Sequence, residues 1–231
     1  MDVYVSAPST KGKSPVVIVL QEAFGVNSHI KNICKRFSAE GYIALAPELF
    51  HRHSKHLQVD YTDRSSIKPL MGSLTNEMLM EDVAATLKLL KDLPSADVSN
   101  VFTIGFCMGG FASLLSSVNF KLNGSVSFYG AGVTRKREGI GYTPFSNELS
   151  KIQNPVLLFF GSHDASITAS DIDEIRNCLD EHNKDYEIEI FPGSDHGFFC
   201  DERKTYDASA ASRGWKKTLS WMQSLLHPKA K

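Results

Sequence analysis

The hydrophobic pattern alternates between short apolar runs and longer stretches in which apolar residues recur every three or four positions. The short runs are rich in β-branched and aromatic residues, which favours strands. They lie at Val16–Leu20, Tyr42–Ala46, Val101–Ile104, Ser125–Tyr129, Val156–Phe160 and Tyr186–Phe191. Val3–Val5 predicts an additional strand at an edge of the sheet.

Helical periodicity separates most of these strands. Apolar residues recur at helical spacing in three sets, namely Ile30, Ile33 and Phe37, then Leu79, Val83, Leu87 and Leu90, then Ile172, Ile175 and Leu179. A last helix is expected from Asp207 to Leu226. Near-continuous apolar strands that alternate with helices are typical of a mostly parallel sheet covered on both faces, the doubly wound α/β class.

The length of 231 residues is enough for one domain, and we expect a single domain over 1–231. Two longer irregular stretches interrupt the pattern, at His51–Thr75 and Thr134–Glu148. In an α/β sheet such segments usually lie over the carboxyl ends of the strands, where ligands bind. The two stretches are therefore candidate walls of a pocket.

Composition and charge exclude several classes of protein. Apolar residues make up 42% and charged residues 22%, which excludes a disordered or collagen-like chain, and the net charge of −1 gives no general attraction to nucleic acid or anionic membranes. The longest apolar runs are far shorter than the roughly 18 residues of a membrane span. Met1-Asp2-Val3-Tyr4 lacks the features of a secretory signal, so we expect a cytoplasmic protein with a small-molecule partner, either a monomer or a small homo-oligomer.

Four cysteines are scattered along the chain without a CxxC pair or a zinc-ligand spacing, which in a reducing compartment predicts free thiols. Cys34 and Cys178 lie on helical periods and are expected to be small core residues. Cys107 stands in Gly105-Phe-Cys107-Met-Gly109, where an apolar strand runs into a helix. Such a turn exposes its central side chain, and the helix amino terminus stabilises a thiolate. Cys107 is a candidate nucleophile, although a buried structural cysteine at a glycine-rich turn remains the alternative.

Two later segments supply the partners that a nucleophile needs. Asp164 follows the strand Val156–Phe160, and His196 follows the strand Tyr186–Phe191. Nucleophile, acid and histidine in this order match the α/β-hydrolase triad. Asp195 is the rival acid, but the side chains of adjacent residues rarely face one another productively.

Motifs along nearly the whole chain resemble the dienelactone hydrolase family of α/β hydrolases, whose members use a Cys-His-Asp triad. The motifs are Leu20-Gln-Glu22-Ala-Phe-Gly25-Val-Asn, Ala46-Pro-Glu-Leu-Phe, Gly105-Phe-Cys107-Met-Gly-Gly, Phe128-Tyr129-Gly130, the Asp164 loop and His196-Gly-Phe-Phe-Cys-Asp-Glu-Arg203. The resemblance implies a cysteine-dependent hydrolase of small carboxylic esters or lactones that works through a thioester and without a cofactor.

The resemblance also implies roles for individual residues. Cys107 would attack the carbonyl carbon as a thiolate held by His196, which Asp164 orients. The backbone N–H groups of Met108 in the turn and of Ala23 in the loop after Val16–Leu20 would bind the oxyanion. Glu22 is implied to contact the resting thiol and to give way when substrate binds, the alternative being a glutamate on a surface loop.

Recognition of the substrate involves arginines in this family, because its reference substrates carry a carboxylate. Arg203 matches the family pattern His-Gly-Phe-x-x-Asp-x-Arg, and Arg64 could match a second arginine from the pocket wall. Dienelactone hydrolases proper have an arginine four residues after the histidine, where this chain has Cys200, so we expect weak activity on dienelactone itself. Tyr129 could line the pocket or could equally be a packing residue.

The histidines of His51-Arg-His53-Ser-Lys-His56 could suggest a metal site, but no cysteine or carboxylate constellation accompanies them, and we expect no metal there. The chain could instead be a general esterase or thioesterase, or a hydrolase fold that has lost catalysis and serves in binding. The remaining alternative is a redox-sensing thiol, for which Cys200 near His196 is the candidate.

Overall fold

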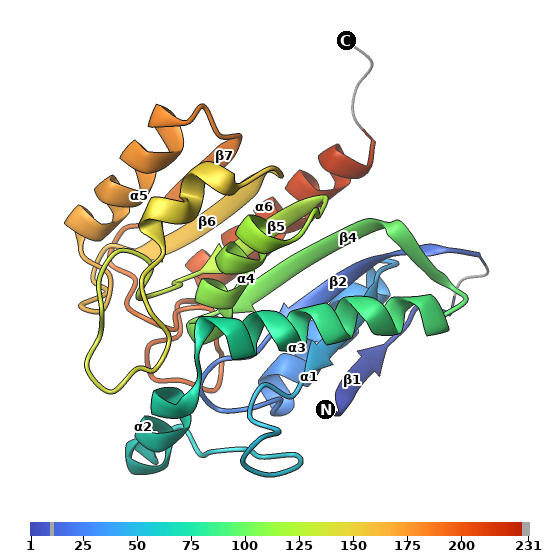
Figure 1. Ribbon diagram of the computed structural model, residues 1–231, viewed down its shortest axis with the longest axis horizontal. Coiled ribbons are helices and arrows are strands. Elements are labelled where there is room, and N and C mark those ends of the chain that lie inside the picture. The colour runs from blue at the N-terminus through green and yellow to red at the C-terminus, as the bar shows by residue number, and fades with distance from the viewer. Residues whose placement is uncertain (10–11, 228–231) are drawn as a thin grey trace.

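A seven-stranded sheet runs through the middle of the computed structural model, which describes residues 1–9 and 12–227 (Figure 1). The expected domain 1–231 thus includes residues 10–11 and 228–231, which lie outside the described residues. The strands in chain order are β1 (Val3–Ser6), β2 (Ser14–Leu20), β3 (Ile43–Pro47), β4 (Ala96–Phe106), β5 (Gly124–Phe128), β6 (Val156–Gly161) and β7 (Tyr186–Phe191). In space their order is β1-β3-β2-β4-β5-β6-β7, and only the β1–β3 pair is antiparallel among the described strands. The mostly parallel α/β class is confirmed.

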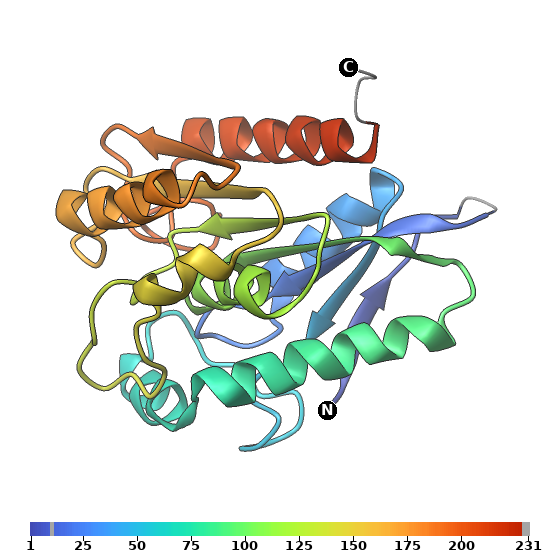
Figure 2. The same cartoon turned by 45° about the horizontal axis from the view of Figure 1, so that its top comes forward.

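Helices cover both faces of this sheet (Figures 1 and 2). They are α1 (Ser28–Ala39), α2 (Arg64–Ser73), α3 (Asn76–Leu89), α4 (Met108–Asn119), α5 (Ala169–Glu181) and α6 (Ala208–Leu226), with short 3₁₀ turns η1 (Leu90–Asp92) and η2 (Ser146–Lys151). On one face α1 and α6 pack together, with the rings of Phe37 and Trp215 4.6 Å apart, while α3, α4 and α5 lie on the other. Within the described ranges, no helix is long and apolar enough to cross a bilayer.

The strand β4 is longer than its apolar run predicts. Val101–Ile104 marks only the part buried between the two helical layers, and the pairing with β2 continues outward to Ala96 opposite Ser14, with a register shift between Pro15 and Val16. Burial therefore determines where the apolar run ends, whereas backbone pairing determines where the strand ends.

The helix α2 is a correction to the sequence analysis, because it lies inside the stretch His51–Thr75 that was expected to be irregular. Its first turn is capped by Asp63, whose side chain accepts a hydrogen bond from the backbone N–H of Ser66 at 3.2 Å. The helix buries only Leu70 and Met71 and contains Pro69, so its sequence carries neither an apolar period nor a typical helical composition.

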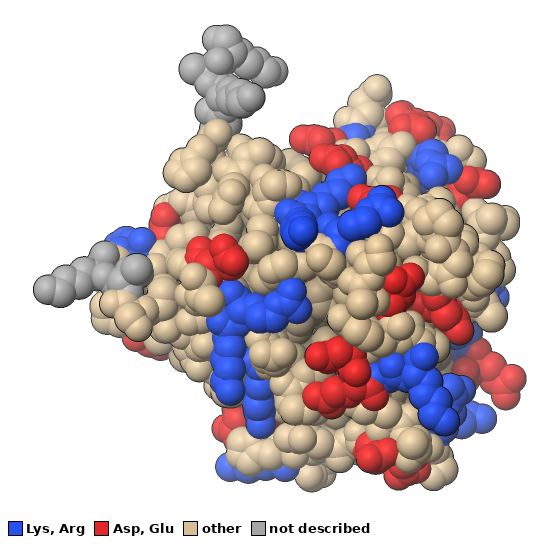
Figure 3. Space-filling model, turned by 180° about the vertical axis from the view of Figure 1, so that it is seen from behind, with Lys and Arg blue, Asp and Glu red and all other residues tan. Residues whose placement is uncertain are grey.

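Charged side chains protect the open edge of the sheet at β7. Lys217 on α6 reaches Glu187 at 3.0 Å and Glu189 at 3.2 Å, which places charges along the last strand of the sheet as described, beyond which no other described strand pairs. The face that carries α1 and α6 shows acidic and basic side chains interspersed over its surface (Figure 3). This mixture agrees with the net charge of −1.

The four cysteines are free thiols, as predicted. Cys34 on α1 is fully buried in the core. Cys178 on α5 is only half-buried and packs against the edge of the core. It is therefore less buried than the predicted core position requires. A helical period locates the inward side of a helix but does not say how well the neighbouring elements cover it.

Candidate active site

Cys107 occupies a strained turn between β4 and α4. Its backbone angles are φ 55° and ψ −115°, in a region that residues with a side chain rarely adopt, and its N–H donates to the carbonyl of Phe128 at 3.0 Å. A Cβ atom on Gly105 would collide with the carbonyl of Gly109, and one on Gly109 would collide with the carbonyl of Leu20. Glycine at both positions lets the strand and helix cross this closely, which presents the cysteine side chain to a cavity.

His196 joins the cysteine to an acidic side chain. Its Nε2 atom lies 3.1 Å from Cys107 Sγ, and its Nδ1 atom lies 2.7 Å from Asp164 Oδ2. The three residues follow β4, β6 and β7 and meet because the carboxyl ends of parallel strands share one edge of the sheet. This is the geometry of a nucleophile, a base and a group that orients the base.

The structure distinguishes between the two candidate acids. Asp164 is buried, and its second oxygen accepts a hydrogen bond from the backbone N–H of Ser166 at 2.7 Å, so its carboxylate is held in place. Asp195 is exposed, and its carboxylate accepts from the backbone N–H of His196 at 2.6 Å. The imidazole ring therefore pairs with Asp164, as the sequence analysis favoured.

The electrostatics of the site favour a protonated His196. Burial by itself lowers the pKa of His196, but the negative charge of Cys107 and hydrogen bonds with Asp164 and Cys107 outweigh it and raise that pKa to about 10. The imidazolium is thus stabilised beside an ionised sulfur. An imidazolium next to a cysteine is the arrangement that supports a reactive thiolate.

Two backbone N–H groups lie where an oxyanion hole is expected. Met108 is the first residue of α4, so its N–H has no partner within the helix, and Ala23 follows β2 and lines the same cavity as Cys107. In the described part of the chain neither N–H donates to another protein group. Both are therefore available to a ligand.

Glu22 is buried and paired with Arg203 rather than with Cys107. Its Oε1 atom accepts a hydrogen bond from Arg203 Nη1 at 3.0 Å, and its Oε2 atom has no hydrogen-bond partner among the described residues. Burial alone would lower the pKa of Arg203, but the charge of Glu22 raises it, so the guanidinium stays charged. The structure thus differs from the resting contact between Glu22 and the thiol that the resemblance implies.

A cavity of about 650 Å³ opens beside Cys107. Both predicted irregular stretches contribute to its walls, and it contains the two predicted arginines, Arg64 at the start of α2 and Arg203. Lys68 and Arg137 add two cations that the sequence analysis missed, since no motif marks them and only the fold brings them to the cavity. Glu138 and Asp195 lie on the same wall, so the lining is mixed but has more basic than acidic side chains.

Tyr129 is fully buried, and its ring centre lies 5.1 Å from that of His196. It is absent from the cavity wall, so of the two alternatives left open by the sequence the structure has the packing residue. The Tyr129 ring packs edge-to-face against the imidazole ring of His196.

The three clustered histidines do not converge on a common point. Each has its own partner: Asp82 for His51 at 3.0 Å, Ser73 for His53 at 2.6 Å and Glu48 for His56 at 2.6 Å. The closely spaced histidines thus stabilise separate contacts of the surface loop.

Cys200 is buried and its Sγ atom lies 3.2 Å from the hydroxyl of Tyr61. Burial raises the pKa of the Cys200 thiol to about 12. A thiol that remains protonated at neutral pH reacts slowly with oxidants, which argues against the redox-sensing alternative.

Fold and site together are those of an α/β hydrolase, with a cysteine, a histidine and an aspartate side by side at the carboxyl ends of the strands. Residues 1–226 match the sequence model of the dienelactone hydrolase family. The chain belongs to this family, and its enzyme class is that of the ester and lactone hydrolases.

Individual relatives agree over nearly the full length. The chain is 36% identical over 225 residues to a Synechocystis protein named “Putative carboxymethylenebutenolidase”, with 96% of this chain and 91% of the relative covered. An Escherichia coli protein of the same name is 33% identical over 228 residues, with 96% and 82% covered. The crystal structure of a “Putative Dienelactone Hydrolase” from Klebsiella pneumoniae superposes with a TM-score of 0.85 at 31% identity, and the match covers 96% of this chain and 92% of that one.

Proposed function

We propose that this enzyme hydrolyses small carboxylic esters or lactones with Cys107 as its nucleophile, through a thioester acyl-enzyme. The observation that carries the proposal is the continuous chain from Cys107 Sγ to His196 to Asp164, at 3.1 Å and 2.7 Å, with the sulfur beside a cavity. A structural cysteine would need neither the strained turn nor a histidine held by a buried carboxylate.

In the first half-reaction the Cys107 thiolate attacks the carbonyl carbon and forms a C–S bond, while the electron pair of the C=O bond moves onto oxygen. The N–H groups of Ala23 and Met108 donate to this oxyanion, and such a donor typically contributes about 3 kcal/mol in the transition state. As the C–O bond to the leaving group breaks, the imidazolium of His196 gives its proton to the departing alkoxide. A thioester on Cys107 and neutral His196 result.

In the second half-reaction His196 removes a proton from a water molecule, and the water oxygen attacks the thioester carbonyl. The same two N–H groups bind the second oxyanion. The C–S bond breaks, the carboxylic acid leaves, and the thiolate and imidazolium are restored. Asp164 remains ionised throughout and stabilises the imidazolium in both halves.

The pair formed by Glu22 and Arg203 belongs, in this proposal, to the activated arrangement. With its Oε1 atom on Arg203, the Glu22 carboxylate leaves the sulfur to His196 alone. A movement of Glu22 towards Cys107 would place a second negative charge next to the thiolate and favour the protonated, resting thiol. Substrate would thus find the active form when Glu22 is held by Arg203.

We further propose that the preferred substrates are anionic. Arg64 and Arg203 both border the cavity, and arginine binds carboxylates through charge-assisted hydrogen bonds. Lys68 and Arg137 would add to the positive potential at the same wall. The volume of about 650 Å³ is in the range of sites for small organic molecules.

A direct test uses an activated aryl ester with the wild-type enzyme, Cys107→Ala and Cys178→Ala. Cys178 is a half-buried thiol on α5, away from the triad, and serves as the matched control. We expect Cys107→Ala to lose turnover with an unchanged circular dichroism spectrum, and Cys178→Ala to keep it. Unchanged turnover in Cys107→Ala would refute the assignment.

A reducing location supports this chemistry, because a thiolate nucleophile is readily oxidised. We therefore propose that the enzyme works in the cytoplasm.

A further inference from the structure

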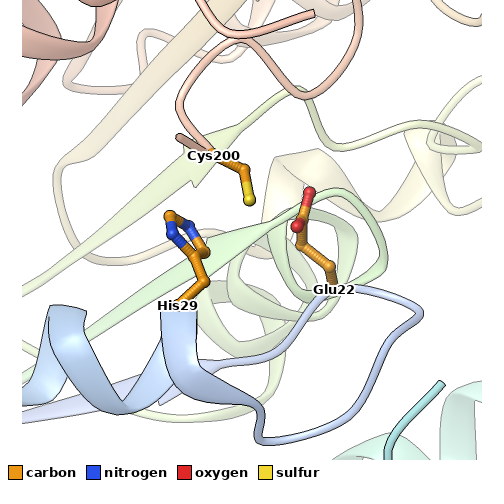
Figure 4. A group of neighbouring side chains, drawn as sticks. All are labelled: Glu22, His29 and Cys200. Carbon is orange, nitrogen blue, oxygen red and sulfur yellow. The ribbon is translucent and has the colours of Figure 1, made fainter. Parts of the chain in front are cut away.

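Behind the active site, three buried side chains from separate segments face one another (Figure 4). Glu22 follows β2, His29 lies in the first turn of α1, and Cys200 lies in the loop after β7. One ligand atom from each, a carboxylate oxygen, a ring nitrogen and the sulfur, lies within 4.8 Å of the other two. No sequence pattern indicates this group, because the fold alone brings the three segments together.

Two of the side chains have buried polar atoms without a partner. Glu22 Oε2 and His29 Nε2 are both inaccessible to solvent and make no hydrogen bond with any described residue. Such atoms are costly to bury, and a native structure usually satisfies them with an ion or a water molecule. The two orphan atoms therefore point to a ligand between them.

Each of the three residues is also held from its outer side. His29 Nδ1 lies 3.4 Å from Asp201 Oδ1, an arrangement that puts the ring proton on Nδ1 and leaves the lone pair of Nε2 free. Glu22 Oε1 is occupied by Arg203, which leaves Oε2 free. The outer contacts of the first two residues thus orient their remaining lone pairs inward.

The third residue, Cys200, is held by Tyr61, whose hydroxyl lies 3.2 Å from the sulfur. The Cys200 thiol donates to this hydroxyl oxygen, as does Asn27 Nδ2 at 2.8 Å, so the Tyr61 proton can turn to the sulfur and stabilise a thiolate once the thiol proton has left.

We propose that Glu22, His29 and Cys200 form a binding site for a zinc-like divalent ion. A carboxylate, an imidazole and a thiolate are the ligand types that Zn²⁺ uses, and three protein ligands leave the fourth tetrahedral position to water. Metal–ligand bonds of roughly 2.0–2.3 Å put ligand atoms about 3.5 Å apart, so the side chains need to close in by little more than about 1 Å per pair.

Charge balance supports a divalent ion. Glu22 contributes one negative charge, and Cys200 contributes a second when its thiol proton passes to solvent on binding. Together they neutralise the ion, while Arg203 and Asp201 in the outer contacts compensate one another. A cavity of about 360 Å³ between α1 and the start of α6 is lined by His29 and Asp201, so one ligand and its outer partner border a solvent-filled space.

Occupation of this site would tie Glu22 to the ion and to Arg203 at once. The site itself does not depend on the proposed catalytic role of Cys107. Binding is therefore tested in the full-length Cys107→Ala protein, which removes the thiol that could otherwise bind metal at the triad.

The probes are Zn²⁺ alone, by competition with a chromophoric chelator, and Co²⁺ alone, by absorption. We expect one equivalent of Zn²⁺ per chain, and with Co²⁺ the strong visible bands of a tetrahedral site together with a near-ultraviolet charge-transfer band from a thiolate. Cys200→Ser in the same background should abolish the charge-transfer band. Asp201→Asn, at a position whose side chain is 57% exposed, should weaken Zn²⁺ binding by roughly 10- to 100-fold without a risk to folding.

The matched control is His56→Gln. His56 forms an exposed group with Asp2 and Glu48 that could also attract a cation, so this variant reports binding at the surface. It should leave affinity and spectra unchanged. Absence of stoichiometric Zn²⁺ binding, a Co²⁺ spectrum without a thiolate band, or equal losses in His56→Gln and Asp201→Asn would overturn the proposal, and would leave a buried water as the occupant of the site.

Discussion

Single side chains of the triad acquire their chemistry from their surroundings. Cys107 depends on a backbone conformation with φ 55°, and His196 on a buried carboxylate 2.7 Å away. The motifs around these residues are local, so the sequence predicted which of them would meet. It did not predict that Arg203 would hold Glu22, because that contact joins residues 181 positions apart and depends on side-chain placement.

The identity of the acid is testable with a pair of asparagine variants. Asp164→Asn removes the charge that holds the Nδ1 proton of His196, so we expect kcat to fall by roughly 10⁴-fold with little change in KM. Asp195→Asn alters an exposed carboxylate at the cavity wall that accepts a hydrogen bond from the backbone N–H of His196 and not from its ring, and should retain most activity. Steady-state kinetics on one ester compare the two variants. A larger loss of kcat in Asp195→Asn than in Asp164→Asn would reassign the catalytic acid to Asp195.

The pH dependence follows from the raised pKa of His196. Because the imidazolium protonates the leaving group, kcat/KM should hold through neutral pH and fall as the pH passes about 10. Asp164→Asn removes one of the groups that raise this pKa, so its falling limb should move to lower pH. A limb that stays in place in Asp164→Asn would mean that another group titrates there.

The same shift has a consequence for stability. The folded-state pKa lies above the ordinary value of 6.5, so protonation of His196 stabilises the folded chain. This contribution is complete below about pH 6.5 and is lost as the pH rises towards 10. Chemical unfolding of wild type and His196→Gln across this range should show a difference that shrinks with increasing pH.

Helices and strands are predictable from the sequence to the extent that they are buried. The strands β2, β3, β5 and β6 are buried on both faces, and their apolar runs located these strands within a few residues, whereas β4 extends beyond its apolar run. The helix α2 was not predicted because it buries only Leu70 and Met71, and two buried residues do not produce a helical period of apolar residues. The elements that form the walls of the cavity were thus the hardest to predict.

The crossing of β2 and α4 depends on Gly109. A Cβ atom there would overlap the carbonyls of Leu20 and Gln21, and rigid backbone cannot yield as a side chain can. We expect Gly109→Ala to lower the free energy of unfolding by roughly 1–3 kcal/mol and to disturb the oxyanion hole. Gly193→Ala is the control for a lost glycine without a clash, because Gly193 has open space around it; unlike Gly109 it has a positive φ, 79°, so backbone strain of about 1 kcal/mol applies there instead. Equal losses in urea unfolding would show that packing at Gly109 is unimportant.

Arg64 brings a positive charge to the cavity from the first turn of α2. If it binds a substrate carboxylate, Arg64→Gln should raise KM for an anionic ester by roughly 10-fold or more and leave a neutral ester of equal size nearly unaffected. Arg176→Gln, on α5 and paired with Asp173, is the matched loss of charge away from the cavity. An equal rise in KM for both variants would indicate that the overall positive charge of the protein attracts the substrate, and not a direct contact with Arg64.

At the scale of the whole molecule, the sheet assembles the site. Parallel strands deliver the loops after β2, β4, β6 and β7 to one edge, so residues scattered over most of the chain meet around one sulfur. The alternation of strands and helices was enough to predict this arrangement, whereas the cations Lys68 and Arg137 became visible only in three dimensions. Topology thus explains the triad, and detailed packing determines what the cavity accepts.

The proposed mechanism requires a covalent acyl intermediate on Cys107. Rapid acid quench during turnover of an ester with a slowly hydrolysed acyl group, followed by peptide mass spectrometry, measures this intermediate directly. We expect the mass of the acyl group on the peptide that contains Cys107, and no acylated peptide from Cys107→Ala. An acyl group on another residue, or full turnover with Cys107 unmodified at every quench time, would contradict it.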